Sequence, residues 1–570
     1  MRRNLRRKLK KLFQKPDTEI APDEIFLDSS NLPDFDRNQF EGRIEKPIGR
    51  RVVLKLGSLF LIIFAVLVAK VWILQVEEGE AYTIQSELNR LRHALIFSER
   101  GVILDRNGTE LAWNTPSETD PFSRRQYTDR PGFAHLLGYV SYPQKDASGV
   151  YYQEKYIGID GVERRYDSLL SGHNGLKIIE ANALGQIESE NVIRPPRDGT
   201  SISLSIDADL EEAVYNILKE IATNSRFEGG SAVVMDIHSG EILALTSYPE
   251  YDPNVLTEGG PSDIIDGYIK DPKKPFLNRA ISGLYAPGSI VKPFIALGAL
   301  DQNVITPEKT ILSTGSISIP NPYVEGAVST FRDWKAHGYV DMRDAIAVSS
   351  DVYFYEVGGG FEDQPGLGIE NIERYMRMFG IGELSNIDLP SETEGVIPNP
   401  AWKEENFPGD EWRVGDTYNT SIGQYGFQVT PIQVVRAVSA IANDGTLLEP
   451  HIRMDTDSGP GDPIPISNED FEVVKEGMQE AVTKGTAVGL QIPGFSLGAK
   501  TGTAQVGVHN EYVNSWTVGF FPYEKPRYAF AVVMERAPSG TLIGSVAAAR
   551  DMLLWINENE PQYLESETPQ

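Results

Sequence analysis

One uninterrupted apolar segment divides this chain of 570 residues into two very unequal parts. Residues 52–76 read VVLKLGSLFLIIFAVLVAKVWILQV, and the stretch from Leu56 to Ala69 carries no charge. The 19 residues from Leu56 to Leu74 are enough to cross about 30 Å of hydrocarbon as a helix. A cleaved signal peptide is disfavoured, because about 50 residues precede the segment and no small-residue cleavage site follows it. We therefore expect a single membrane-spanning helix over residues 51–76.

The residues on the two sides of this segment differ in charge. Residues 1–15 contain eight Lys or Arg and no acidic residue, whereas the whole chain carries a net charge of −28. Basic residues in front of a membrane helix indicate that the N-terminus is cytoplasmic and that the larger part lies outside. Residues 16–50 are polar, so 1–50 is expected to be a flexible, basic cytoplasmic tail. Residues 558–570, with four Glu and no basic residue, are expected to be an acidic tail.

Composition excludes several classes of function. The chain has no cysteine, which rules out disulfide scaffolds, thiol nucleophiles and iron–sulfur clusters. Its excess of acidic residues disfavours nucleic acid as the main partner, because phosphate binding needs a basic surface. Any nucleophile must therefore be an oxygen or an amine.

The larger part divides at Pro195, Pro196 and Gly199 into two regions, 77–198 and 199–557. In the smaller region we expect a helical continuation over 77–97, a hairpin over 99–108, a loop over 111–134, a strand over His135–Val140 and a helix over Gly158–Gly175. In the larger region we expect helices over Asp207–Ala222 and Val546–Ile556, and strands over Ala232–Met235, Glu241–Ser247, Trp516–Phe520 and Tyr528–Glu535. Strands at both ends with helices between them predict one α/β or α+β domain whose sheet uses both chain ends.

Three short motifs in the larger region carry candidate chemistry. Ser289 and Lys292 are three residues apart after the helix-breaking pair Pro287-Gly288, so Ser289 is expected to open a helix with Lys292 on the same side. A neutral lysine amine can take the proton that makes a serine hydroxyl nucleophilic, and a helix N-terminus favours the developing oxyanion. Each motif alone is weak evidence, since Ser-x-x-Lys is common on solvated helix surfaces.

The second and third motifs follow in order. Ser349-Ser350-Asp351, taken alone, is typical of a helix N-cap. In Lys500-Thr501-Gly502-Thr503, the lysine offers a cation to a carboxylate and the threonines offer hydroxyl groups. This last motif is expected on an edge strand, where Gly502 would let a substrate backbone come close.

The ordered set of three motifs resembles the serine penicillin-recognising enzymes, and further segments extend the resemblance to class B penicillin-binding proteins of the elongation type, penicillin-binding protein 2-like. These segments are Arg100-Gly101 to Gly108, His135–Val140, Gly161–Gly175, Asn278-Arg279-Ala280, Gly415-Asp416-Thr417, Ile422-Gly423-Gln424, Thr430–Gln433 and Gly519–Pro522. The resemblance implies an α+β, β-lactamase-like transpeptidase domain (199–557) on a mainly β pedestal (77–198), behind one N-terminal transmembrane helix.

The resemblance also implies a function, a peptidoglycan D,D-transpeptidase acylated by penicillin. Ser289 would attack the D-Ala–D-Ala bond of a stem peptide, with Lys292 as the base. Ser349 would relay a proton to the leaving amine, and Asp351 would hold Lys292. Lys500, Thr501, Gly502 and Thr503 would bind the terminal carboxylate, and the N–H groups of Ser289 and Thr503 would form the oxyanion hole. Implied partners are stem peptides, β-lactam antibiotics, the lipid bilayer and a SEDS-type glycan polymerase, with no nucleic acid.

The chain departs from the family in two places. Only about 20 residues separate Asn114 from His135, where relatives carry a longer upper pedestal. Some relatives bind zinc through a cysteine; here Asp333, His337 and Asp341 are suggestively spaced, but without a cysteine a polar loop is the expectation. We therefore expect no cofactor and no metal. Two alternatives stay open, a hydrolytic D,D-carboxypeptidase or β-lactamase, and a scaffold that activates the glycan polymerase.

Overall fold

The computed structural model describes residues 50–80, 91–181, 187–321, 324–456 and 459–564, in two compact units, 1–90 and 91–570. In the first unit, α2 (Arg50–Trp72) continues into a π-helical turn, η3 (Ile73–Glu77). Among the described residues, Arg51–Glu77 is the one helix long and apolar enough to cross a membrane, with a mean hydropathy of 2.7. The predicted helix is therefore present, whereas residues 1–49 and 565–570 of the predicted tails lie outside the described residues.

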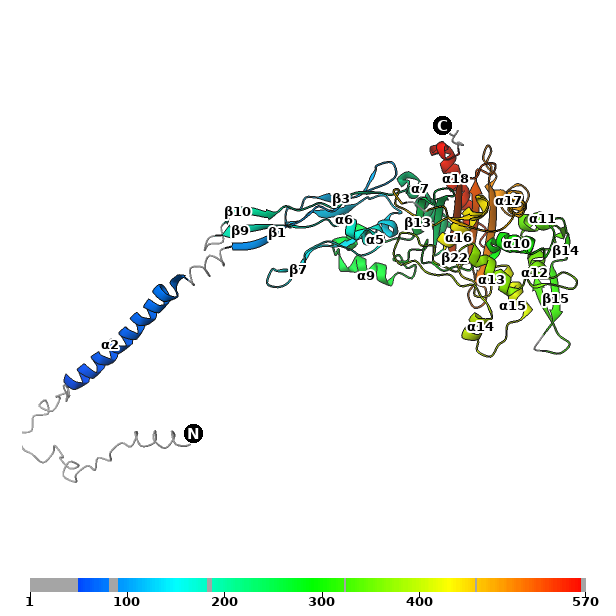
Figure 1. Cartoon of the computed structure of the whole chain (residues 1–570). Helices are drawn as coiled ribbons and strands as arrows, with labels where there is room; N and C mark the ends of the chain where they lie inside the picture. Colours follow the sequence, from blue (N-terminus) through cyan, green and yellow to red (C-terminus); the bar gives the residue numbers. More distant parts are fainter. Residues whose placement is uncertain (1–49, 81–90, 182–186, 322–323, 457–458, 565–570) are drawn as a thin grey trace, which may run out of the picture. The chain divides into compact units, whose positions relative to one another are not determined.

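The second unit begins with the pedestal, which is built on two small sheets. One is antiparallel in the order β1 (Leu91–Ile96), β9 (Gly175–Ala181), β10 (Ile187–Arg194), and the other has the order β11 (Ile202–Ser203), β2 (Ile103–Leu104), β3 (Glu110–Thr115), β4 (Arg124–Tyr127). The short elements between them are α4 (Ala134–Leu137), β5 (Val140–Ser141), β6 (Gln144–Lys145), β7 (Tyr151–Gln153), β8 (Ile157–Gly158), α5 (Gly161–Arg165) and α6 (Asp167–Leu170). The strands β1, β9 and β10 extend away from the larger part of this unit (Figure 1).

Several expectations for the pedestal are corrected by this arrangement. The hairpin over 99–108 is confirmed as the β2–β3 pair, with Gly108 in the left-handed region at its turn. Residues 91–96, expected to be helical, form β1, and the expected loop over 111–134 contains most of β3 and all of β4. The expected strand over His135–Val140 begins as a helix, α4, and the expected helix over Gly158–Gly175 is two short helices. Distant pairing decides β1, because its partner β9 lies about 80 residues later and tertiary context overrides local propensity.

A buried charge cluster holds the pedestal together. Glu163 of α5 accepts from Arg100 Nε at 2.6 Å and from Arg125 Nε at 2.7 Å, and all three side chains are fully buried. Arg100 also pairs with Asp167 at 2.8 Å. Burial alone would raise the pKa of Glu163, but the two guanidinium groups outweigh it and hold that pKa below its ordinary value. The resemblance segments around Arg100 and Glu163 therefore meet in one structural site.

The larger part of the unit is organised around a five-stranded antiparallel sheet. Its order is β13 (Ile242–Tyr248), β12 (Gly229–Asp236), β22 (Tyr528–Pro538), β21 (Tyr512–Phe521), β20 (Gly498–Val506). Helices α7 (Ala208–Ser225) and α18 (Ser545–Asn559) pack on one face, and α16 (Pro431–Ala442) packs on the other (Figure 1). Along β12, Val233 and Met235 join the core with α16, whereas Ala232 and Val234 join the core with α7 and α18.

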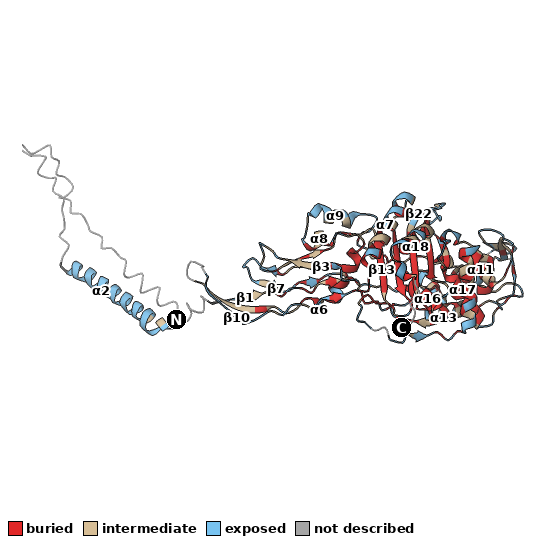
Figure 2. Cartoon of the chain, turned by 90° about the horizontal axis from the view of Figure 1, so that it is seen from above, coloured by how far each residue is buried: buried red, intermediate tan, exposed pale blue. Residues whose placement is uncertain are grey.

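The strands and terminal helices expected in the larger region are confirmed. The sheet also combines strands from both ends of that region, as expected, since β12 pairs with β22. Figure 2 shows the buried residues concentrated in the sheet and the helices around it. The remaining elements are α8 (Pro253–Thr257), α9 (Ser262–Lys270), η4 (Gly288–Val291), α10 (Lys292–Asp301), β14 (Ile311–Ser313), β15 (Ser316–Pro320), β16 (Val328–Arg332), β17 (Gly338–Val340), α11 (Met342–Val348), α12 (Asp351–Gly359), α13 (Ile369–Met378), α14 (Pro400–Asn406), α15 (Val414–Ser421), β18 (Thr446–Leu447), β19 (Asp462–Pro463), α17 (Asn468–Thr483), η5 (Val488–Leu490) and η6 (Pro561–Tyr563).

Candidate active site

A cleft of about 970 Å³ lies beside the edge strand β20 and brings the three motifs together. Six of the eight residues singled out from the sequence line it: Ser289, Ser349, Asp351, Thr501, Gly502 and Thr503. The other two, Lys292 and Lys500, are fully buried behind the cleft. The sequence motifs therefore form one constellation, in which the serines and threonines face the opening and the lysines support them.

Ser289 lies in a single tight turn before a buried helix. The turn is η4, and α10 follows it directly, so Ser289 stands at the start of helical structure, as expected from Pro287-Gly288. The N–H of Gly288 donates to Gly423 O at 3.0 Å. The indole of Trp516 donates to Ala286 O at 3.0 Å. These contacts from two other segments fix the turn that presents Ser289 to the cleft.

The second motif sits at a break between two helices. Helix α11 ends at Ser349, which adopts a left-handed conformation (φ 58°), and Ser350 caps α12 by accepting from Tyr353 N. The cap expected for this motif is therefore Ser350. Asp333 reinforces the break, because its Oδ2 accepts from Ser350 Oγ at 2.8 Å and from Val352 N at 3.0 Å. The break leaves the Ser349 hydroxyl free to point toward the lysines.

The Ser349 hydroxyl lies between the two buried lysines. Lys292 Nζ donates to Asp351 Oδ1 at 2.6 Å, to Ser349 O at 2.8 Å and to Ser349 Oγ at 3.2 Å. Lys500 Nζ donates to Ser349 Oγ at 2.9 Å and to Thr501 O at 2.8 Å. Burial lowers the pKa of Lys500 well below its ordinary value, and the neighbouring Lys292 lowers it further, while Asp351 opposes the shift. Amines and hydroxyl thus form a continuous path along which a proton can move.

The third motif lies on the sheet edge, as expected. The hydroxyl of Thr501 donates to Thr486 Oγ1 at 2.7 Å, and the side chain of Thr503 is exposed to the cleft. Gly502 also has a steric role, because a Cβ there would lie 2.8 Å from Pro287 O and 2.9 Å from Ile290 Cγ2. The glycine therefore makes room for the Ser289 turn.

We expect Gly502→Ala to lower the second-order rate of penicillin acylation by at least about 100-fold, because the added methyl must push η4 away from β20 and near-attack geometry tolerates little displacement. Stopped-flow measurement with a fluorescent penicillin checks this. Gly267→Ala is the matched control, since a Cβ at Gly267 meets no atom within 4 Å. Equal rates for the two variants would contradict the packing role of Gly502.

Most other residues that line the cleft belong to no recognisable sequence motif, so sequence alone did not identify them as site residues. Arg332, Trp334 and Tyr355 come from β16, the segment after it, and α12. Asn419, Gln424 and Tyr425 come from α15 and the turn that follows it. Two further lining residues, Ile422 and Gln424, lay in a segment noted in the sequence, Ile422-Gly423-Gln424.

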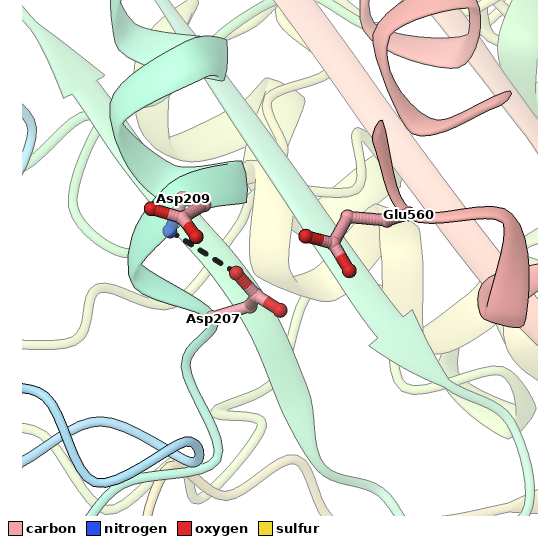
Figure 3. Close-up of side chains that lie close together, drawn as sticks. All are labelled: Asp207, Asp209 and Glu560. Carbon is pink, nitrogen blue, oxygen red and sulfur yellow. Dashed lines mark hydrogen bonds between the residues drawn. The ribbon is translucent and has the colours of Figure 1, made fainter. Parts of the chain in front are cut away.

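Two groups of side chains have residue types that can bind a metal ion. Asp333 and Asp341 serve as helix caps, and His337 Nε2 lies 3.4 Å from Asp333 Oδ1. The described residues hold one cluster of three acidic side chains, Asp207, Asp209 and Glu560, whose oxygens lie within 4.8 Å of one another (Figure 3). Asp207 caps α7 and accepts from Tyr563 OH at 2.6 Å, and Asp209 pairs with Arg130. The four aspartates of these two groups therefore have structural contacts of their own.

Comparison with known proteins shows the family to which the chain is similar. A family described as "Penicillin binding protein transpeptidase domain" matches residues 230–553, more than half of the chain, and the "Penicillin-binding Protein dimerisation domain" matches residues 118–204. A curated relative from Haemophilus influenzae, "Peptidoglycan D,D-transpeptidase MrdA", is 31% identical over 78% of this chain and 71% of its own length.

Two solved structures are similar over most of the chain. The Helicobacter pylori structure described as a complex between penicillin-binding protein (PBP2) and MreC has a TM-score of 0.69 and 28% identity, covering 83% of this chain and 100% of its own. A structure entitled "Structural coordination of polymerization and crosslinking by a peptidoglycan synthase complex" has a TM-score of 0.68 and 25% identity, covering 89% and 98%.

The chain belongs to the penicillin-binding protein family and carries its transpeptidase domain. Within that family it is a class B enzyme of the penicillin-binding protein 2 type, which confirms the resemblance drawn from the motifs. Together with the apolar helix α2, this indicates a membrane-anchored protein.

Proposed function

We propose that this chain is a peptidoglycan D,D-transpeptidase of cell elongation that works through an acyl-enzyme on Ser289. One observation carries the proposal: Ser289 lines the cleft at a helix start, with the hydrogen-bonded set Lys292, Ser349 and Lys500 brought together beside it. The activity printed for the curated relative supports the same reaction.

In the acylation step, Ser289 Oγ attacks the carbonyl of the D-Ala–D-Ala bond while the amine of Lys292 takes its proton. The N–H groups of Ser289 and Thr503 stabilise the oxyanion. As the C–N bond breaks, Ser349 gives its proton to the leaving D-Ala amine and is reprotonated from the lysines that flank it. Asp351, at 2.6 Å, holds Lys292 in place.

In the second step, an amine from a neighbouring stem peptide attacks the acyl-enzyme. A new amide bond forms, the ester bond to Ser289 breaks, and the serine regains a proton. Before D-Ala leaves in the first step, Thr501 and Thr503 offer hydroxyl groups to the terminal carboxylate of the donor at the cleft wall. Lys500 is fully buried, so it acts on the reaction indirectly, through its hydrogen bond to Ser349 and its electrostatic effect on the cleft.

The test is to label the protein with a fluorescent penicillin, digest it and map the modified peptide. We expect the label on the peptide that contains Ser289 and an acyl-enzyme that persists for many minutes. A label on another peptide would overturn the assignment. Rapid turnover would favour the hydrolytic alternative, which lacks support because none of the described cleft residues is a glutamate that could activate water.

The membrane arrangement belongs to the same proposal. The basic residues in 1–15 support a cytoplasmic N-terminus, with the catalytic part outside the membrane. Protease added to spheroplasts should then degrade the catalytic part and spare the N-terminal tail; the reverse pattern would refute this orientation.

A SEDS-type glycan polymerase in the membrane is the proposed partner, supported by the similar structure whose title joins polymerization and crosslinking. Catalysis and scaffolding can be separated by asking which variants restore growth to cells that lack this protein. We expect both Ser289→Ala and a chain with a foreign membrane helix to fail, whereas full rescue by Ser289→Ala would mean that scaffolding alone suffices.

A further inference from the structure

The accessible charge of the cleft is unusual for a site that receives an acidic peptide. Among the described residues that line it, only Arg332, Asp333 and Asp351 are charged. The Asp333 side chain is fully buried and that of Asp351 is 18% exposed. Both carboxylates already have partners, in Ser350 and Lys292. The two lysines of the motifs are fully buried, so Arg332 is the single cation of this described lining that an incoming group can reach.

The backbone of Arg332 is fixed while its side chain is free. Arg332 is the last residue of β16 and pairs with Ser316 of β15, and its carbonyl accepts from Tyr355 OH at 3.1 Å. The preceding Phe331 packs edge-on against Tyr355 and Tyr418, at 5.8 and 5.0 Å between ring centroids. Among the described residues, by contrast, the Arg332 guanidinium makes no hydrogen bond or ion pair, and the side chain is exposed.

We propose that Arg332 is a specificity-determining residue that binds a carboxylate of the stem peptide other than the terminal one. The proposal rests on the function proposed above. A guanidinium presents a planar fork that matches a carboxylate with two parallel hydrogen bonds. In a protein with a net charge of −28, one cation beside two carboxylates supplies the local attraction that an anionic substrate otherwise lacks. Trp334, 57% exposed on the same wall, offers an apolar face next to it.

The test compares two penicillins that differ by a single group. Benzylpenicillin and α-carboxybenzylpenicillin share the ring system, and the second adds one carboxylate on the acyl side chain, which takes the place of the stem residues before D-Ala–D-Ala. The second-order rates of Ser289 acylation are measured for both with the full chain in detergent. In Arg332→Gln, we expect the rate ratio of the carboxylated to the plain penicillin to fall by about fivefold or more, as for a charge-assisted pair at a partly exposed site.

Two variants control for general effects. Lys335→Gln removes the same charge from the same segment, but Lys335 lies over the Trp334 ring at 4.5 Å and does not line the cleft, so its rate ratio should stay unchanged. Arg332→Lys should restore part of the ratio, because it keeps the charge and loses the fork.

The outcomes separate this inference from the proposed function. If both penicillins acylate Ser289 and the ratio is the same in Arg332→Gln as in the wild type, the inference fails alone. If Arg332→Gln slows both penicillins equally, Arg332 has a structural role and the inference also fails. If neither penicillin acylates Ser289 in the wild type, the proposed function itself fails.

Discussion

Replacing Ser289 by alanine is expected to abolish covalent labelling by penicillin, lowering the acylation rate by about 10⁴-fold or more, because no other group can form the ester. The reason is geometric as well as chemical. Ser289 lines the cleft, whereas Ser349, the other cleft serine of the motifs, is 6% exposed and engaged by both lysines. The measurement is gel fluorescence after incubation with a labelled penicillin over a range of times.

Ser282→Ala provides the matched control for this prediction. Ser282 lies seven residues earlier and donates to Ser391 O at 2.7 Å, outside the cleft. It should label at the wild-type rate. Persistent labelling of Ser289→Ala at the usual rate would show that another residue is the nucleophile, and the mechanism above would have to be abandoned.

The second large effect concerns stability. Glu163→Gln removes the one carboxylate, among the residues that the structure describes, that pairs with both buried guanidinium groups, at 2.6 and 2.7 Å; Asp167 reaches Arg100 alone. Leaving buried charges without a partner costs about 3–5 kcal/mol. We therefore expect the free energy of local opening of the pedestal to fall by about that amount, measured by hydrogen exchange of amides in residues 99–170.

The control for Glu163 is an ion pair on the surface of the same region. Asp120 pairs with Arg124 at 2.6 Å, with both side chains about one-third exposed, so Asp120→Asn should cost less than about 1 kcal/mol. Similar exchange in the two variants would argue against a stabilising role for the buried cluster. Because the pKa of Glu163 is held below its ordinary value of 4.5, its contribution is complete above that pH. It is lost as the pH falls through the folded-state pKa.

The sequence predicted well those parts of the site and of the fold that a local sequence pattern determines. Pro287-Gly288 before an apolar run predicted a helix start, and Ser289 stands there. Alternating and continuous apolar stretches predicted the strands that became β12, β13, β21 and β22, because strands buried on both faces are rich in apolar residues. The order of the three motifs identified the family.

Long-range neighbours could not be predicted in the same way. The role of Gly502 depends on Pro287 and Ile290, more than 200 residues earlier, which no local pattern reveals. The surroundings of Lys500 depend on Lys292, Ser349 and Asp351, which lie far earlier in the chain, rather than on its own strand. Arg332 was missed because a lone arginine at the end of a hairpin has no motif, and only the three-dimensional lining of the cleft singles it out.

The central sheet also has a consequence for how the enzyme matures. Strand β22 lies between β12 and β21, and β12 pairs with β22 about 300 residues later in the chain. A polypeptide still being synthesised contains Ser289 and Lys292 well before it contains Lys500, so the incomplete sheet cannot assemble the active site. Closing so long a loop makes this pairing a late and slow event. Reactivity toward acyl donors should therefore begin only after the C-terminal strands β21 and β22 have been synthesised and β22 has paired with β12.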